Sequence, residues 1–142
     1  HEHIAAAGAW SLMPGRNMLV VDMGTAVTYD FVSAEGRFKG GNIAPGIGMR
    51  LRSLHNYTAR LPEVNGYGDI PLLGVDTASA MRAGAVRGVV AEICYYRSQL
   101  PEGTEVVLTI VCTKHVASFL PFEATIDKCL VTKGLLSILL NC

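Results

Sequence analysis

The chain has 142 residues, of which 50% are hydrophobic and 17% are charged, and its twelve basic side chains balance twelve acidic ones. This composition excludes a largely disordered chain, and the length suits one domain with a sizeable core. Zero formal net charge provides no basic surface for nucleic acid, and no apolar run approaches the ~20 residues of a membrane span. The four cysteines form no C-x-x-C pair and are interpreted as reduced cytosolic thiols, so we expect a single cytoplasmic domain with neither nucleic acid nor membrane as a partner.

The first third of the chain predicts a helix followed by three strands. Residues 1–12 are rich in alanine and precede Pro14-Gly15, as is typical of the end of a helix. The segments 18–23 (MLVVDM), 26–32 (AVTYDFV) and 37–45 (RFKGGNIAP) are separated by turn residues. This spacing predicts an antiparallel meander of three strands.

Helices and strands alternate in the rest of the chain. A helix is predicted over 47–57, and either Asp76 or Thr77 can cap a long helix with an apolar residue at every fourth position. These recurring residues are Met81, Ala85, Val89 and Ile93. Further predictions are a buried strand over 105–112, a helix over 115–120, a strand over 129–131 and a helix over 133–140. The order predicts an α/β fold with a mixed five-stranded sheet and helices on both faces.

The turn after the first predicted strand carries unusual chemistry. Asp22 is an acidic residue in an apolar run, and Gly24, Thr25 and Thr28 follow it. A glycine turn with hydroxyl side chains can hold phosphate oxygens, while the aspartate can attract a cation. A plain hairpin in which Asp22 caps its own turn is the alternative interpretation.

Four motifs occur in a fixed order along the chain: D-x-G-T-A-x-T-x-D (22–30), G-G-x-I-x-P-G (40–46), T-A-x-L-P (58–62) and G-x-D-T-x-x-A-x-x-x-G (74–84). Together they resemble the second half of type III pantothenate kinases, which are members of the actin-like ATPase superfamily with a ribonuclease H-like fold. The resemblance implies that residues 1–142 form one domain, equivalent to the C-terminal half of a two-domain kinase whose N-terminal half is absent from this chain.

The resemblance also implies a reaction and its partners. Enzymes of this family transfer the γ-phosphoryl group of ATP to pantothenate, giving 4′-phosphopantothenate in the first step of coenzyme A biosynthesis. The expected cofactors are ATP, accompanied by magnesium, and a monovalent cation, potassium or ammonium. A homodimer with the pantothenate site near the subunit interface is expected. The alternative is a noncatalytic homologue or fragment that acts as a binding or regulatory module.

Individual site residues follow from the family motifs. By resemblance, Asp22 binds the monovalent cation, and Thr25, with Gly24 and Thr28, contacts ATP. Thr77 contacts pantothenate from the start of the long helix, where free backbone amides suit a polar or anionic ligand. Thr77 acting only as the helix N-cap is the alternative.

The chain departs from the family pattern at three places. The catalytic proton acceptor is an aspartate in the family, and its position corresponds to Glu2; the neighbouring substrate-binding arginine corresponds to His3, which cannot form the same bidentate contact. Both residues could instead be exposed at a frayed chain end. Ile110 and Val111 replace a diglycine that gives the nucleotide close access to the backbone. Finally, nothing here matches the D-x-G-N-T turn of the family's preceding domain.

The remaining candidates have structural interpretations. Asp30 could lie near the cation, but a solvated or turn-bonded carboxylate is the preferred hypothesis. Gly40 and Gly41 are interpreted as positions where the backbone passes close to a neighbour. His55 and His115 have no carboxylate or cysteine at ligand spacing, so we expect neither to bind a metal.

Overall fold

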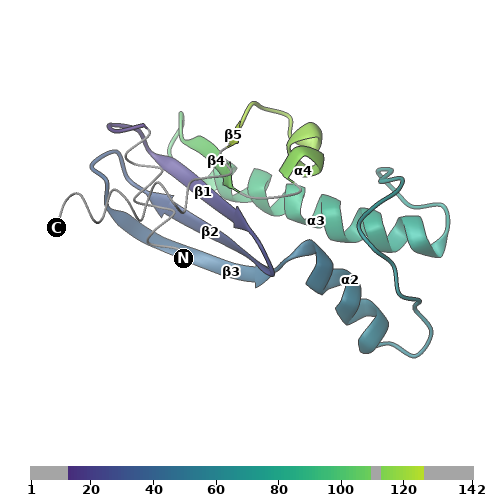
Figure 1. Cartoon of the computed structure of the whole chain (residues 1–142). Helices are drawn as coiled ribbons and strands as arrows, with labels where there is room; N and C mark the ends of the chain where they lie inside the picture. Colours follow the sequence, from purple (N-terminus) through teal and green to yellow (C-terminus); the bar gives the residue numbers. More distant parts are fainter. Residues whose placement is uncertain (1–12, 110–112, 127–142) are drawn as a thin grey trace.

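The computed structural model describes residues 13–109 and 113–126, with side chains omitted at 113–115. Five strands form one sheet in the spatial order β3-β2-β1-β4-β5 (Figure 1). The strands are β1 (Met18–Met23), β2 (Ala26–Val32), β3 (Phe38–Pro45), β4 (Glu105–Thr109) and β5 (Thr125–Ile126). The helices are α2 (Ile47–Asn56), α3 (Thr77–Gln99) and α4 (Thr113–Phe119).

The sheet is mixed, as the sequence predicts. β2 pairs antiparallel with both β1 and β3, whereas β4 pairs parallel with β1 and β5. The chain leaves the meander at the end of β3, passes through α2 and α3, and returns as β4 beside the first strand. β1 is therefore the central strand, and its carboxyl end lies next to the carboxyl end of β4.

Both faces of β1 contribute to a core, because all six of its residues are buried. Leu19, Val21 and Met23 belong to the larger core cluster, which contains Val89 and Ile93 of α3. The alternate residues Met18 and Val20 belong to a second cluster with Val32 and Val107. Alternate strand residues point to opposite faces, so α3 covers one face and the second cluster lies on the other.

The long helix α3 packs against α2 along its first part and against the sheet along its second part. All four members of its predicted apolar stripe are buried: Met81, Ala85, Val89 and Ile93. The first two pack with Leu51 of α2, and the last two pack on the sheet. Accordingly, α3 runs past the end of the sheet to lie beside α2 (Figure 1).

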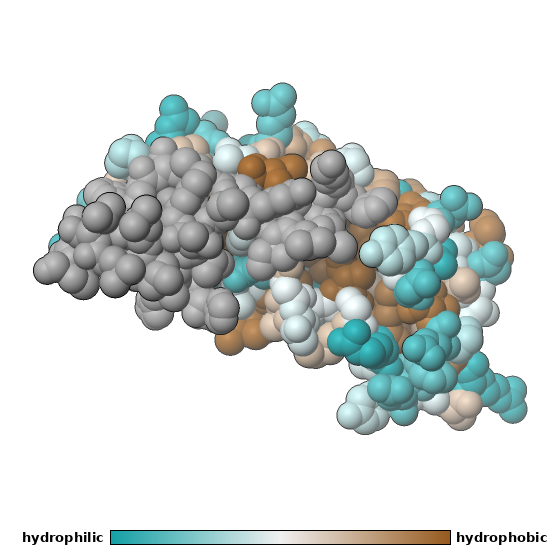
Figure 2. Space-filling model, viewed as in Figure 1, coloured by the Kyte–Doolittle hydropathy of each residue, from teal (hydrophilic) through white to brown (hydrophobic). Residues whose placement is uncertain are grey.

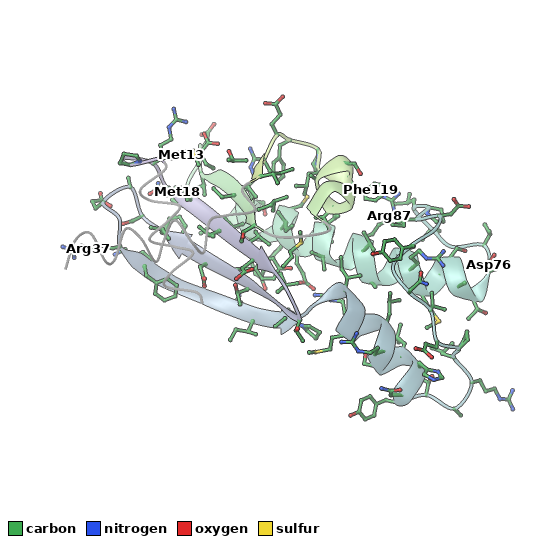
Figure 3. All side chains as sticks on the ribbon, viewed as in Figure 1. Met13, Met18, Arg37, Asp76, Arg87 and Phe119 are labelled. Atoms are coloured by element: carbon green, nitrogen blue, oxygen red, sulfur yellow. The ribbon has the colours of Figure 1, made fainter. Side chains whose placement is uncertain are left out.

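The helix α4 packs beside α3 and is tied to it by an aromatic contact. The guanidinium carbon of Arg87 lies 4.4 Å from the centroid of the Phe119 ring, within the range of a cation–π contact (Figure 3). The predicted helix over 115–120 is thus confirmed, with an earlier start.

Some predicted elements lie outside the described residues: the helices over 1–12 and 133–140, and the strand over 129–131. The fifth strand that the structure describes is β5, at Thr125–Ile126. Helices were predicted on both faces of the sheet, and the described helix α3 covers one of these faces. Within the described ranges, no helix combines the length and apolarity required to cross a membrane.

An apolar loop leads into α3. Leu72, Leu73 and Val75 are 76%, 80% and 90% exposed, respectively. In Figure 2, hydrophobic residues (brown) reach the surface on the right of the view, where α3 begins, whereas the end of α2 at lower right is mainly hydrophilic (teal). Contiguous exposed apolar side chains are typical of a surface that another molecule covers.

Candidate functional site

The link between β1 and β2 is a turn of two exposed residues, Gly24 and Thr25. The Gly24 amide donates to the Ala26 carbonyl (3.0 Å), and the Gly46 amide donates to the Thr25 carbonyl (2.9 Å). A Cβ atom on Gly46 would collide with the carbonyl oxygens of Gly24 and Thr25, so only glycine lets the start of α2 lie this close. The backbone at Gly46 therefore holds the turn in place, and the Thr25 side chain remains exposed and accessible to a ligand.

Beneath this turn lies a group of three polar side chains with buried oxygen atoms, which we call the Asp22 cluster: Asp22, Thr28 and Thr109. Thr28 of β2 and Thr109 of β4 are the two register partners of Asp22 across the neighbouring strands. Directly paired residues of adjacent strands project from the same face, so the three side chains lie side by side. Asp22 is 8% exposed and Thr109 is 0% exposed.

Three oxygen atoms of the Asp22 cluster are buried polar atoms that the described residues leave unsatisfied. Asp22 Oδ1, Thr28 Oγ1 and Thr109 Oγ1 are buried and have no hydrogen-bond partner among the residues that the structure describes. Each unsatisfied buried polar atom lowers the stability of the fold by about 1–3 kcal/mol. Three such atoms side by side therefore indicate a ligand that binds to them. A carboxylate and two hydroxyl oxygens attract a hard cation.

The charge of the cluster suits a monovalent cation. Asp22 supplies one negative charge, whereas the threonines are neutral oxygen ligands. In the described part of the chain, no group of three or more His, Cys, Asp or Glu side chains could hold a metal ion. Since divalent ions usually recruit several carboxylates, this donor set fits an ion of single charge.

Burial raises the pKa of the Asp22 carboxyl above its ordinary value. The cause is desolvation, because the charged form loses its hydration in the sheet. A cation at the cluster would act in the opposite direction and favour the ionised carboxylate. The electrostatics and the unmet oxygen atoms therefore favour the same kind of ligand.

Thr77 lies elsewhere in the chain. It is exposed at the first position of α3, and Figure 3 shows the adjacent Asp76 at the end of the helix that is remote from the sheet. The side chain of Asp76 accepts from the Ser79 amide (2.8 Å), and the Ser79 hydroxyl accepts from the Asp76 amide (3.2 Å). Asp76 is therefore the N-cap, and the interpretation of Thr77 as only a cap is wrong.

Thr77 and the Asp22 cluster do not come together within one chain. The side chain of Asp22 shares the face of Met18 and Val20, whereas α3 covers the opposite face. The other site residues that the sequence suggests, Glu2 and His3, lie outside the described residues, as do Ile110 and Val111.

The structure corrects the expectation for Asp30 and refines those for two glycines. Asp30 is 1% exposed, so the solvated interpretation is wrong. A Cβ on Gly41 would collide with the Asp30 carboxylate, which confirms a close approach there. A Cβ on Gly40 would meet no described atom within 4 Å, so close approach is not the reason for this glycine, but Gly40 has a φ of +136°, beside the irregularity between Phe31 and Val32. Gly40 is thus required for its backbone conformation.

His55 lies at the surface, as expected, with its Nδ1 atom 2.8 Å from the Leu61 carbonyl oxygen. The side chain of His115 lies outside what the structure describes.

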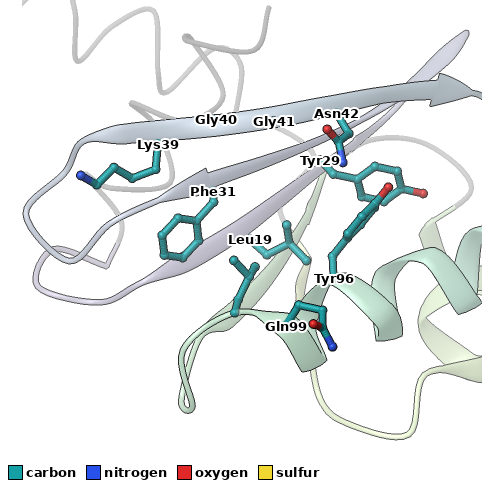
Figure 4. A pocket seen from close by; sticks show the side chains of 10 residues that line it. Leu19, Tyr29, Phe31, Lys39, Gly40, Gly41, Asn42, Tyr96 and Gln99 are labelled. Carbon is teal, nitrogen blue, oxygen red and sulfur yellow. The ribbon is translucent and has the colours of Figure 1, made fainter.

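A hollow of about 290 Å³ lies between β3 and the end of α3 (Figure 4). Its lining includes Leu19, Tyr29 and Tyr96, and the rings of the two tyrosines have centroids 4.9 Å apart. Leu19 and Tyr29 point to the α3 face of the sheet. The hollow is therefore separate from the Asp22 cluster, which is on the opposite face.

Thr109 is a member of the Asp22 cluster that was not predicted from the sequence. It stands at the end of a run of apolar residues, where its polarity is the only local signal. Its role becomes visible through the parallel pairing of β4 with β1, which places Thr109 opposite Asp22.

Solved structures with a similar architecture come from proteins of different descriptions. A protein described as a Baf family transcriptional activator from Campylobacter jejuni matches with a TM-score of 0.73 and 23% identity, over 97% of this chain and 63% of that one. A protein described as a 2-dehydro-3-deoxygalactonokinase from Sinorhizobium meliloti matches with a TM-score of 0.62 and 13% identity, over 94% of this chain and 57% of that one. These likenesses concern the fold and confirm the predicted actin-like ATPase architecture.

Sequence comparison gives a closer relationship. The family model for type III pantothenate kinase matches residues 2–99. Type III pantothenate kinases from Azobacteroides pseudotrichonymphae and Phocaeicola vulgatus are 42% and 40% identical to this chain, over 96% and 94% of its length. The chain spans about half of each relative, 56% in both cases. The chain belongs to the type III pantothenate kinase family.

Proposed function

We propose that the protein catalyses the ATP-dependent phosphorylation of pantothenate to 4′-phosphopantothenate, the first step of coenzyme A biosynthesis. The family relationship supports this reaction. The observation that carries the proposal is the Asp22 cluster, in which three buried oxygens that find no hydrogen-bond partner among the described residues lie directly beneath an exposed glycine-threonine turn.

In this proposal, the Asp22 cluster holds potassium or ammonium through the Asp22 carboxylate and the hydroxyls of Thr28 and Thr109. Thr28 was expected to contact ATP, but its buried Oγ1 atom favours a place with the ion. When bound, such an ion supplies positive charge close to phosphate oxygens. The bound cation then neutralises the ionised Asp22 carboxylate, so a basic side chain is not required for that purpose.

The turn above the cluster binds the nucleotide. The Thr25 hydroxyl and the backbone at Gly24 contact phosphate oxygens of ATP, which magnesium accompanies. Phosphoryl transfer depends mainly on positioning and on stabilisation of charge. The rigid support of this turn by Gly46 meets the first requirement. Glu2 accepts the proton of the pantothenate hydroxyl, and His3 contacts the same substrate.

A homodimer reconciles the position of Thr77 with its proposed contact to pantothenate. Within one chain, Thr77 lies at the end of α3 that is remote from the sheet, whereas the Asp22 cluster lies in the sheet. In a dimer, Thr77 of one copy can approach the Gly24–Thr25 turn of the other, which we call the phosphate turn. The exposed Leu72, Leu73 and Val75 directly precede α3, and a second copy would cover them. We expect the dimer in the cytoplasm, where ATP is available.

The test is a coupled assay of ATP consumption by the purified full-length gene product. Turnover is expected only when pantothenate is present together with potassium or ammonium, and sodium should not replace them. Binding of pantothenate without turnover would favour the noncatalytic alternative. Turnover that is indifferent to the cation would contradict the role of the Asp22 cluster.

A further inference from the structure

The start of α2 is fastened to the rest of the molecule by a network of three side chains, which we call the Arg50 network: Arg50, Glu92 and Tyr29. The Glu92 Oε1 atom accepts from Arg50 Nη2 (2.7 Å) and from the Tyr29 hydroxyl (2.6 Å). One carboxylate oxygen of α3 thereby joins α2 and β2. The Arg50 and Glu92 side chains are only 17% and 31% exposed, and Tyr29 is 2% exposed.

The same arginine reaches back to the end of β3. Arg50 Nε donates to the Pro45 carbonyl (2.7 Å). The N-cap of α2 is Gly46, which has no side chain to cap the helix, and the hydrogen bond from Arg50 to Pro45 is a side-chain contact that joins this helix start to the end of β3. A Cβ on Gly88 would lie 3.1 Å from Arg50 Nη1, which shows how closely the guanidinium passes over α3.

The backbone that Arg50 holds is the support of the phosphate turn. Gly46 follows Pro45, and its amide donates to the Thr25 carbonyl (2.9 Å). The Gly46 Cα also lies so close to Gly24 and Thr25 that no side chain fits between them. A displacement of the Pro45–Gly46 segment must therefore move the Gly24–Thr25 turn as well.

The protonation states of the network suit a fixed geometry. Burial, and then the hydrogen bond and charge of Glu92, raise the pKa of Tyr29, so its hydroxyl remains a donor. Burial alone would raise the pKa of Glu92, but the hydrogen bonds from Arg50 and Tyr29 and the charge of Arg50 outweigh it, and the pKa is lowered. Partly buried ion pairs contribute little to the net stability of the fold. They can instead hold the elements that they join in one relative position.

We propose that the Arg50 network is a set of positioning residues, which fixes the Gly24–Thr25 turn for ATP through the Pro45–Gly46 backbone. This inference rests on the proposed kinase function for its catalytic consequence. The structural link from Arg50 to Thr25 stands independently of that function. None of the three side chains needs to contact the substrate for the network to act.

The experiment compares Arg50→Lys with Arg52→Lys in the full-length gene product. Lysine keeps the charge but cannot bond Pro45 and Glu92 in the same forked geometry. Arg52 is exposed on the same helix, and the described residues give it no hydrogen bond or ion pair, so it is a matched control. Glu92→Gln provides a conservative rescue, because its amide oxygen can still accept from both donors.

Residue-resolved amide hydrogen exchange is the first measurement. Arg50→Lys should accelerate exchange of the Gly46 amide about tenfold, while amides at 89–93 of α3 exchange as in the unsubstituted protein. Arg52→Lys and Glu92→Gln should leave the Gly46 amide nearly unchanged. Uniform acceleration in every region would indicate general destabilisation, and unchanged exchange at Gly46 would equally overturn the proposal.

Steady-state kinetics is the second measurement. Arg50→Lys should raise KM for ATP about tenfold and leave KM for pantothenate unchanged, because only the phosphate turn is displaced. If KM for both substrates changes equally, the positioning role is refuted. If the unsubstituted protein shows no turnover, the proposed function fails, but the exchange measurement still decides whether Arg50 orders the turn. Should Arg50→Lys not fold, Tyr29→Phe tests the same network through loss of one donor.

Discussion

At the residue scale, Asp22 is stabilised in its neutral form by burial, so the charge of this side chain should cost stability when no suitable cation is present. Its folded pKa is raised above the unfolded value of about 3.9. Consequently, the folded state loses stability as the pH rises from the unfolded pKa to the folded one, and the loss then stays constant. In buffers with only large organic cations, Asp22→Asn should remove this loss, as measured by urea unfolding from pH 3 to pH 8.

The response to potassium provides the complementary prediction for Asp22. At pH 7, potassium should stabilise the unsubstituted protein by roughly 1 kcal/mol or more, about 3–5 °C in Tm for a chain of this size. Asp22→Asn should abolish the response. Asp69→Asn, at an exposed aspartate, is the control and should retain it. An equal response in all three proteins would show that potassium binds somewhere other than the Asp22 cluster.

At the element scale, the local pattern predicted most of the elements well. The β-branched run of β1, the turn residues after it and the four-residue stripe of α3 each follow from short-range rules. The Asp22 cluster could be predicted only in part, because Thr109 becomes its member through a parallel pairing with a strand far away in the chain. The Arg50 network was missed for the same reason, since Arg50, Glu92 and Tyr29 belong to three separate elements.

The junction of β3 and α2 yields a prediction about Gly46. Gly46→Ala should destabilise the fold by about 1–3 kcal/mol, because the new Cβ collides with two carbonyl oxygens that cannot move independently of the turn. Gly84 is exposed in the interior of α3, where an added Cβ would meet no described atom within 4 Å, so Gly84→Ala should instead stabilise the fold by about 0.5–1 kcal/mol. Thermal unfolding distinguishes the two variants. A neutral Gly46→Ala would mean that α2 is free to shift away from the turn.

At the scale of the whole molecule, the chain contains the exposed Gly24–Thr25 turn and the Asp22 cluster but covers only about half of the length of its relatives. Efficient phosphoryl transfer needs a nucleotide that is oriented and shielded from water on every side. The Gly24–Thr25 turn is exposed, so it provides contacts on one side only. The family could be predicted from the sequence because all four motifs lie in this chain. The complete site could not, because Thr77, which belongs to the fourth motif, lies away from the Asp22 cluster in the fold.

A hybrid protein tests this view. The Bacteroides fragilis relative is 40% identical over 57% of its own length, so its unmatched part can be joined in front of the present 142 residues. We expect no turnover of pantothenate by the 142-residue chain alone and measurable turnover by the hybrid in potassium, because the added part closes the nucleotide site. The hybrid with Asp22→Asn should lose the dependence on potassium, which ties the activity to the Asp22 cluster. Robust turnover by the 142 residues alone would contradict the prediction, since an exposed turn and an ion site would then suffice to orient ATP and exclude water.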